Sequence, residues 1–442
     1  MNDKALQGVI GSLLTARNDA KKQTASFTAS PSMMKKGTFQ VVSSKGKGYV
    51  LGSEGISCVD HAIDLISSDP VLREHFSRAY VTTKINDLVQ TLIEVTDQDL
   101  QAQTIEQVKK LLEDMEKAPV LQWKITTPIT NLVIKSVPFQ VGRATFALMD
   151  NKMADAILSS INAISKTSTS PEEVKEETMK QITEQIQKRY TTRSVATLTV
   201  EASDMTNAIE HAEVEIEHSL NALRFYSRVV TKNDARSYRM FIGAEGTVFA
   251  GQRSTICLRP EQEFSFPYRN VGYFFPYEID AQTIGLMQKI SLDKLSNMLQ
   301  KHVNKRSEFE KLLVTAVDFF GTAMNHPSPR EAYLSFVISL EALLLKEGEP
   351  RGLLAERVAL VVGESYDERN TLFEQMEKIY TLRSRIVHNG FSDVTEEDVR
   401  IVSIIAFQVI ARLLSMLDKL NDIGKLISAS AKSKFGGPPL NP

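Results

Sequence analysis

The last third of the chain carries hydrophobic residues at helical spacing, with polar residues between them. Glycine and proline interrupt this pattern at positions such as Gly321, Pro327 and Gly363, which is typical of connections between helices. Residues 291–427 are therefore expected to form an all-α bundle. The periodicity predicts helices over residues 291–303, 305–325, 329–346, 351–363, 367–388 and 395–421.

The first two-thirds of the chain alternates between helical and strand-like patterns. Residues 120–149 and 241–279 are rich in β-branched and aromatic residues, which indicates strands. Asp204 is expected to cap a long helix over residues 205–230. The fold class is thus expected to be α+β. The predicted domains are a mixed α+β region at 1–202, a β-rich segment with one long helix at 203–290, the helical bundle at 291–427 and a flexible tail at 428–442.

Composition narrows the functional classes. The 442 residues include 42% hydrophobic and 24% charged residues, which is ordinary for a globular protein. Lysine plus arginine number 52 and aspartate plus glutamate 54, so any nucleic-acid site must depend on a local patch. Cys58 and Cys257 are far apart, which excludes a disulfide framework and a cysteine-rich zinc site. No apolar stretch approaches the ~20 residues that span a bilayer. We expect a soluble cytoplasmic protein that makes no contact with membranes.

One pair of residues has a spacing that suggests chemistry. Arg383 precedes His388 by five positions, at the end of a predicted helix that stops at Asn389-Gly390. The negative end of a helix favours a protonated imidazole, so His388 is placed to take and give a proton near neutral pH. Arg383 is a permanent cation suited to a phosphate. Five residues rotate a helix by about 140°, so two copies packed together would converge the groups better than one copy alone.

The same two residues also have purely structural interpretations. Arg383 can pair with a nearby carboxylate such as Glu377. A histidine near the end of a helix often acts only as a favourable terminal cation. The spacing by itself therefore leaves both interpretations open.

Three motifs and one apolar helix between Pro329 and Leu417 form a recognisable pattern. They are Ser339-Leu340-Glu341-Ala342-Leu343-Leu344, Leu354-Ala355-Glu356-Arg357-Val358-Ala359-Leu360, Ile379-Tyr380-Thr381-Leu382-Arg383-Ser384-Arg385-Ile386-Val387-His388-Asn389-Gly390 and the helix from Glu396. This stretch resembles the HEPN superfamily, most closely its Apea-like branch.

The resemblance implies a dimerising helical bundle, in which Arg383 and His388 are the R-x(4–6)-H signature and Ser384 is the polar residue that follows the arginine. Catalytic members are metal-independent endoribonucleases in which the ribose 2′-hydroxyl attacks the adjacent phosphate. Some toxin branches carry a tyrosine two residues after the histidine, where this chain has Gly390.

On this resemblance the chain is expected to cleave RNA, such as tRNA or mRNA, as a homodimer without metal or cofactor, in prokaryotic antiphage defence. His388 would be the base or acid and Arg383 would bind the phosphate, while Ser384 and Arg385 would position RNA. The region before the bundle would sense a trigger or restrain the nuclease, alone or with a regulatory partner. Glu341 can either orient one of these groups or form a structural ion pair with Arg357, and we expect the ion pair.

Two other functional readings remain open. The bundle can instead be a non-catalytic HEPN scaffold that dimerises and binds a partner protein or a nucleotide. A metal-dependent nuclease in the N-terminal region is the third reading. Glu173-Val174-Lys175 has the E-x-K ending of such enzymes, but it lacks the hydrophobic strand that would hold it, so we expect it to lie on a solvated helix face. Farther along, His211, Glu215 and His218 have the helical spacing of metal ligands, although we expect these histidines to face water.

Overall fold

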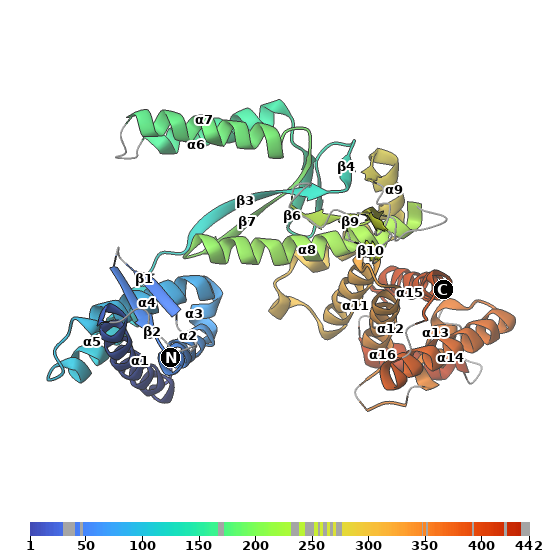
Figure 1. Ribbon diagram of the computed structural model, residues 1–442. Helices are drawn as coiled ribbons and strands as arrows, with labels where there is room; N and C mark the ends of the chain where they lie inside the picture. Colours follow the sequence, from blue (N-terminus) through green and yellow to red (C-terminus); the bar gives the residue numbers. More distant parts are fainter. Residues whose placement is uncertain are drawn as a thin grey trace. The chain divides into compact units, whose positions relative to one another are not determined.

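The chain contains two compact units, and its helices and antiparallel sheet confirm the predicted α+β class (Figure 1). One unit comprises Met1–Ile125 and Thr199–Ala212, and the other comprises Thr126–Leu198 and Glu213–Pro442. Among the described residues, no helix has the length and apolar character needed to cross a bilayer. The computed structural model describes residues 1–29, 40–44, 47–166, 172–230, 238–243, 252–254, 257–259, 263–265, 268–270, 276–346, 348–350, 352–390, 393–419 and 422–434.

The first unit is a small helical domain with one antiparallel hairpin. Its apolar core includes Leu13, Ile63 and Val89, all almost fully buried. The buried guanidinium of Arg17 donates to the carbonyl oxygens of Leu92 and Val95, so the end of one helix is fixed to another. The elements are α1 Asp3–Ala29, β1 Gln40–Ser44, β2 Lys47–Leu51, α2 Ser53–Ser67, α3 Pro70–His75, α4 Arg78–Ile93 and α5 Leu100–Glu116.

The second unit contains a five-stranded sheet with the strand order β5-β6-β7-β3-β8. A separate pair, β4 and β13, is parallel, and β9–β12 and β10–β11 form antiparallel pairs. The sheet strands are β3 Leu121–Thr130, β5 Phe139–Val141, β6 Ala144–Leu148, β7 Ser194–Ala202 and β8 Phe241–Ile242. The other strands are β4 Leu132–Ile134, β9 Gln252–Ser254, β10 Cys257–Arg259, β11 Glu263–Ser265, β12 Tyr268–Asn270 and β13 Tyr277–Ile279.

Three elements contain residues of both units. These elements are β3, β7 and the long helix α8, Met205–Val230. The predicted bounds of α8 are confirmed, and Asp204 caps it by accepting a hydrogen bond from the backbone N–H of Asn207 at 3.0 Å.

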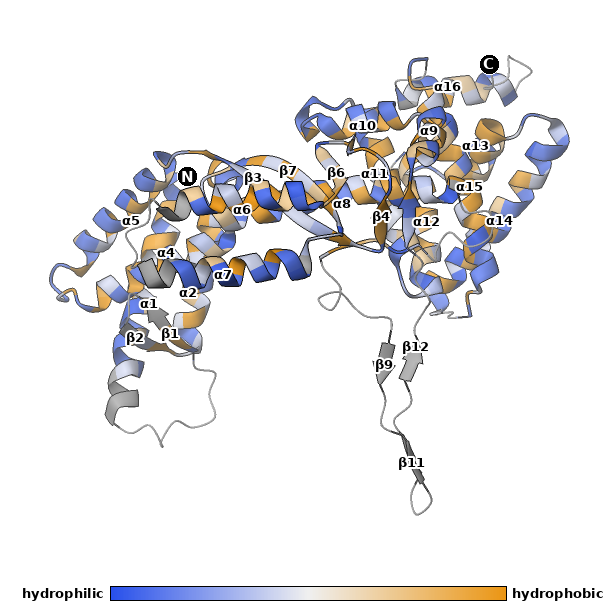
Figure 2. Cartoon of the chain, turned by 90° about the horizontal axis from the view of Figure 1, so that it is seen from above, coloured by the Kyte–Doolittle hydropathy of each residue, from blue (hydrophilic) through white to orange (hydrophobic). Residues whose placement is uncertain are grey.

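Two helices of the second unit form a hairpin with a small core of its own. Helix α6 spans Asn151–Lys166 and α7 spans Glu172–Arg189, so the E-x-K residues predicted to lie on a solvated helix are indeed in a helix. Hydrophilic and hydrophobic residues alternate along both helices (Figure 2). Met149, Ala154, Ile186 and Val195 form their buried core, with further apolar side chains packed around it.

The C-terminal bundle contains every helix that the periodicity predicted. Buried apolar side chains join its helices, as where the rings of Phe320 and Phe336 meet edge to face at 4.9 Å. Helix α16 runs into the segment expected to be a flexible tail, where Ser430 and Ser433 are buried, whereas residues 435–442 lie outside the described residues. The helices are α9 Ala281–Lys289, α10 Leu292–Gln300, the 3₁₀ turn η3 Val303–Lys305, α11 Glu308–Asn325, α12 Pro329–Leu344, α13 Gly352–Val362, α14 Tyr366–Asn389, α15 Glu396–Ser415 and α16 Ile423–Lys434.

Gly321 does not separate two helices, contrary to the interpretation from the sequence. It lies inside α11, where it is buried against α8. A Cβ atom at this position would lie 2.5 Å from the Cα of Asn221. The glycine is therefore needed because the backbones of α8 and α11 approach each other closely at this point.

Candidate functional site

Helix α14 carries the predicted Arg383 and His388, and local signals define both of its ends. Ser365 and Glu368 form a capping box at its start. Gly390 ends it in the left-handed conformation, with φ of 65°, as the Asn-Gly signal predicted. Ile379 and Ile386 are buried on one face, so the opposite face of α14 is left available for chemistry.

Arg383 lies against α12 in a cluster of three polar residues. Its Nε is 3.6 Å from Oε1 of Glu341, and each side chain of this ion pair is about one-fifth exposed. The hydroxyl of Tyr380 donates to the same carboxylate oxygen at 3.0 Å. The guanidinium carbon of Arg383 lies 5.7 Å from the centroid of the Tyr380 ring. Glu341 therefore fixes both the tyrosine and the arginine of α14.

The predicted ion pair between Glu341 and Arg357 is wrong. Arg357 instead binds Glu349 through two hydrogen bonds of 2.5 and 2.8 Å and also donates to the carbonyl oxygen of Leu344. These contacts close the end of α12, and the bonds from Arg357 lower the pKa of Glu349 to about 2. The two residues separate because Arg357 satisfies the carbonyl at the end of α12, whereas Glu341 lies a turn earlier, beside α14.

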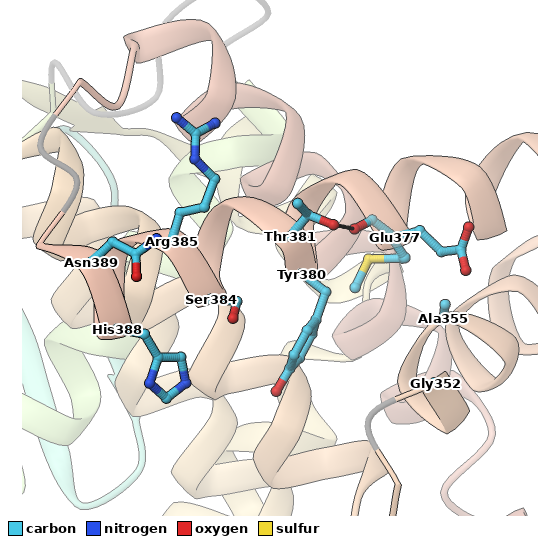
Figure 3. A pocket seen from close by; sticks show the side chains of 10 residues that line it. Gly352, Ala355, Glu377, Tyr380, Thr381, Ser384, Arg385, His388 and Asn389 are labelled. Atoms are coloured by element: carbon cyan, nitrogen blue, oxygen red, sulfur yellow. Dashed lines mark hydrogen bonds between the residues drawn. The ribbon is translucent and has the colours of Figure 1, made fainter.

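His388 is exposed in the last turn of α14, where it lines an open groove of about 600 Å³. We call this the α13–α14 groove, because Gly352 and Ala355 of α13 form its other wall. Figure 3 shows Tyr380, Ser384 and His388 pointing to the same side of α14, whereas Arg385 points away from them. Tyr380 therefore belongs both to the polar cluster around Arg383 and to the groove that His388 lines.

A single chain does not bring Arg383 and His388 to one point. Arg383 faces Glu341, whereas His388 faces the α13–α14 groove. Arg383 pairs with Glu341 instead of Glu377, which also lines the groove. Sequence reasoning missed Tyr380, although its spacing of four and eight residues before Ser384 and His388 places all three on one helical face.

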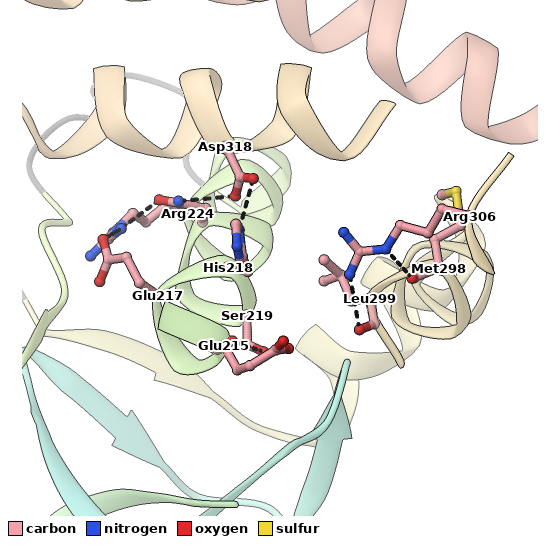
Figure 4. Close-up of polar contacts among 10 residues, drawn as sticks. Glu215, Glu217, His218, Ser219, Arg224, Met298, Leu299, Arg306 and Asp318 are labelled. Atoms are coloured by element: carbon pink, nitrogen blue, oxygen red, sulfur yellow. Dashed lines mark hydrogen bonds and ion pairs between the residues drawn. The ribbon is translucent and has the colours of Figure 1, made fainter. Parts of the chain in front are cut away.

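The metal-ligand spacing on α8 leads to a different arrangement. Nδ1 of His218 is 2.8 Å from a carboxylate oxygen of Asp318 on α11, so this histidine does not simply face water (Figure 4). Glu215 lies 3.9 Å from Arg143, which belongs to the turn before β6. Across the described part of the chain, no three His, Cys, Asp or Glu residues are grouped as metal ligands. The cluster instead joins α8 to the bundle.

We expect the pair of His218 and Asp318 to make stability depend on pH. The hydrogen bond that His218 donates to the carboxylate of Asp318 raises the pKa of His218 above its ordinary value of 6.5. Burial and Arg306 oppose this rise in the pKa, and the charges of Asp318 and Glu215 add to it. Its contribution is full below the unfolded-state pKa and is lost as the pH rises through the folded pKa. Thermal unfolding followed from pH 6 to pH 9 should therefore show wild type losing more stability than His218→Gln. Parallel curves would contradict this.

The chain matches no protein-family model, no curated protein and no solved structure. The resemblance to HEPN proteins therefore stays a prediction.

Proposed function

We propose that the C-terminal bundle is a HEPN-type, metal-independent endoribonuclease that acts as a homodimer. The observation that carries the proposal is the arrangement on α14. One helix presents a cation anchored by Glu341 and, about 140° around the helix axis, an exposed imidazole beside a groove. Two copies of α14 facing each other would place the arginine of each copy near the histidine of the other. The resemblance extends the proposal to antiphage defence.

The proposed chemistry needs a base, an acid and a positive charge. His388 of one copy would take the proton from the ribose 2′-hydroxyl, whose oxygen would then form a bond to the adjacent phosphorus. The bond from phosphorus to the 5′-oxygen would break, and the second His388 would give that oxygen a proton. Arg383 would stabilise the charge on the phosphorane, and Ser384 and Arg385 would position the RNA. The products would be a 2′,3′-cyclic phosphate and a free 5′-hydroxyl.

A non-catalytic scaffold is the second candidate, and the charge beside the groove favours it. A neighbouring hollow of about 670 Å³ on α14 is lined by carboxylates as well as by Lys378 and Arg385. Carboxylates repel a phosphate backbone, whereas a basic protein surface would pair with them. These acidic residues are Glu374, Glu377, Asp393 and Asp398.

Incubation of the purified chain with total RNA in excess chelator separates these functions. We expect cleavage to persist without divalent metal and to leave cyclic phosphate ends, because the groups named above supply every proton and charge. The measurement is gel analysis of the RNA, with end-group mapping of the fragments. Cleavage that chelator abolishes would indicate the metal-dependent nuclease, and a dimer that leaves RNA intact would indicate the scaffold.

A further inference from the structure

The α13–α14 groove extends well beyond the histidine. Its lining on α14 runs from Met376 to Asn389, which is about 20 Å along the helix axis. Its volume of about 600 Å³ lies within the range of sites for small organic ligands. The groove therefore has room for a nucleotide at the end opposite His388, in addition to the phosphate that reacts.

The residues of α13 that line the groove are small, so they leave it wide. Gly352 is exposed, and a Cβ atom added to it would meet nothing within 4 Å. Ala355 is buried and contributes only its methyl group. A larger residue at position 352 would therefore project into open space and would narrow the groove without a clash in the bundle.

The groove end distant from His388 offers groups that suit a nucleobase. Tyr380 provides an aromatic ring whose hydroxyl is fixed by Glu341, and aromatic rings stack on bases of single strands. Glu377 provides an exposed carboxylate, which accepts hydrogen bonds from the exocyclic amino groups of bases. The carbonyl O4 of uracil would face this carboxylate unfavourably, because both are acceptors.

We propose that the α13–α14 groove binds the base of a nucleotide near the scissile phosphate, with Tyr380 as the stacking wall and Glu377 selecting bases that carry an amino group over uracil. This subsite rests on the proposed ribonuclease function for its role in cleavage. Its binding property is independent of that function, because the groove and its carboxylate are present in the chain whether or not His388 transfers a proton.

The test measures binding of CMP and UMP to the full chain by NMR titration, and cleavage of oligoribonucleotides that differ by one cytosine or uracil. Wild type should bind CMP about fivefold or more tightly than UMP. Glu377→Gln should lose this preference, and Gly352→Leu should lose binding of both nucleotides. Glu374→Gln and Gly11→Leu are the matched controls, because the first changes a neighbouring carboxylate outside the groove and the second an exposed helical glycine elsewhere.

The outcomes separate the subsite from the nuclease. Selective CMP binding without any RNA cleavage would overturn the proposed function and support the subsite. If wild type, Glu377→Gln and Gly352→Leu all cleave RNA with the same sequence preference, the subsite would be overturned and the proposed nuclease would stand. Dissociation of a dimer by Gly352→Leu, with nucleotide binding absent from wild type, would show that a second copy occupies the groove and would also overturn the subsite.

Discussion

Replacement of His388 by alanine is expected to lower the rate of RNA cleavage by about 10²–10⁴-fold, the usual contribution of a general acid or base. The loss follows from the proposed dimer, because each copy of the substitution removes either the proton acceptor or the proton donor. His388 is exposed at the end of α14, so its removal leaves no cavity in the bundle. Single-turnover cleavage of a labelled RNA measures the effect.

The control for this substitution is His61→Ala, an exposed histidine on α2 of the first unit. It should cleave RNA at the wild-type rate. Glu341→Gln should give a smaller loss than His388→Ala, because it only loosens the position of Arg383. Wild-type cleavage by His388→Ala, with a folded protein by circular dichroism, would remove His388 from the mechanism.

Gly321→Ala is expected to destabilise the second unit by about 2 kcal/mol, within the range for overpacked interiors. The new methyl group would collide with the backbone of Asn221, which cannot rotate away. Helices α8 and α11 would have to separate, and this would stretch the hydrogen bonds that Asp318 accepts from Asn221 and His218. For a unit of this size the unfolding temperature should fall by about 3 °C.

Gly285→Ala is the matched control for Gly321→Ala. It lies inside helix α9 of the same unit, and an added Cβ would meet nothing within 4 Å. Alanine favours a helix over glycine by about 0.5–1 kcal/mol, so this variant should be slightly more stable than wild type. Differential scanning fluorimetry measures the unfolding temperatures of both variants. Equal stabilisation of Gly321→Ala and Gly285→Ala would refute the close approach of α8 and α11.

Helix α8 and the helices of the bundle were predictable because their signals are local. Apolar periodicity, the Asp204 cap and the Asn389-Gly390 stop each depend on a few neighbouring residues, and the structure confirms them. The position of His388 in the last turn of α14 follows from the same signals. The helical spacing of Tyr380, Ser384 and His388 would also have allowed the prediction that these three residues share one face of α14.

Contacts between distant segments were not predictable in this way. A glycine within a helical pattern predicts the end of a helix. Only the close approach of α8 in the structure explains why Gly321 is needed inside α11. Glu341 and Arg357 stand on neighbouring apolar helices, which suggested that they pair. The connection between those helices supplies Glu349 as a competing partner, and sequence does not rank two carboxylates by their distance from one arginine.

Tyr380 contacts two sites, because its hydroxyl donates a hydrogen bond to Glu341 and the residue also lines the α13–α14 groove. A base that shifts its ring would also shift the guanidinium beside it. The identity of the bound base should therefore change the turnover number as well as the Michaelis constant. Selectivity of this kind acts on the rate of the chemical step. An RNA with a disfavoured base would therefore bind but would be cleaved slowly.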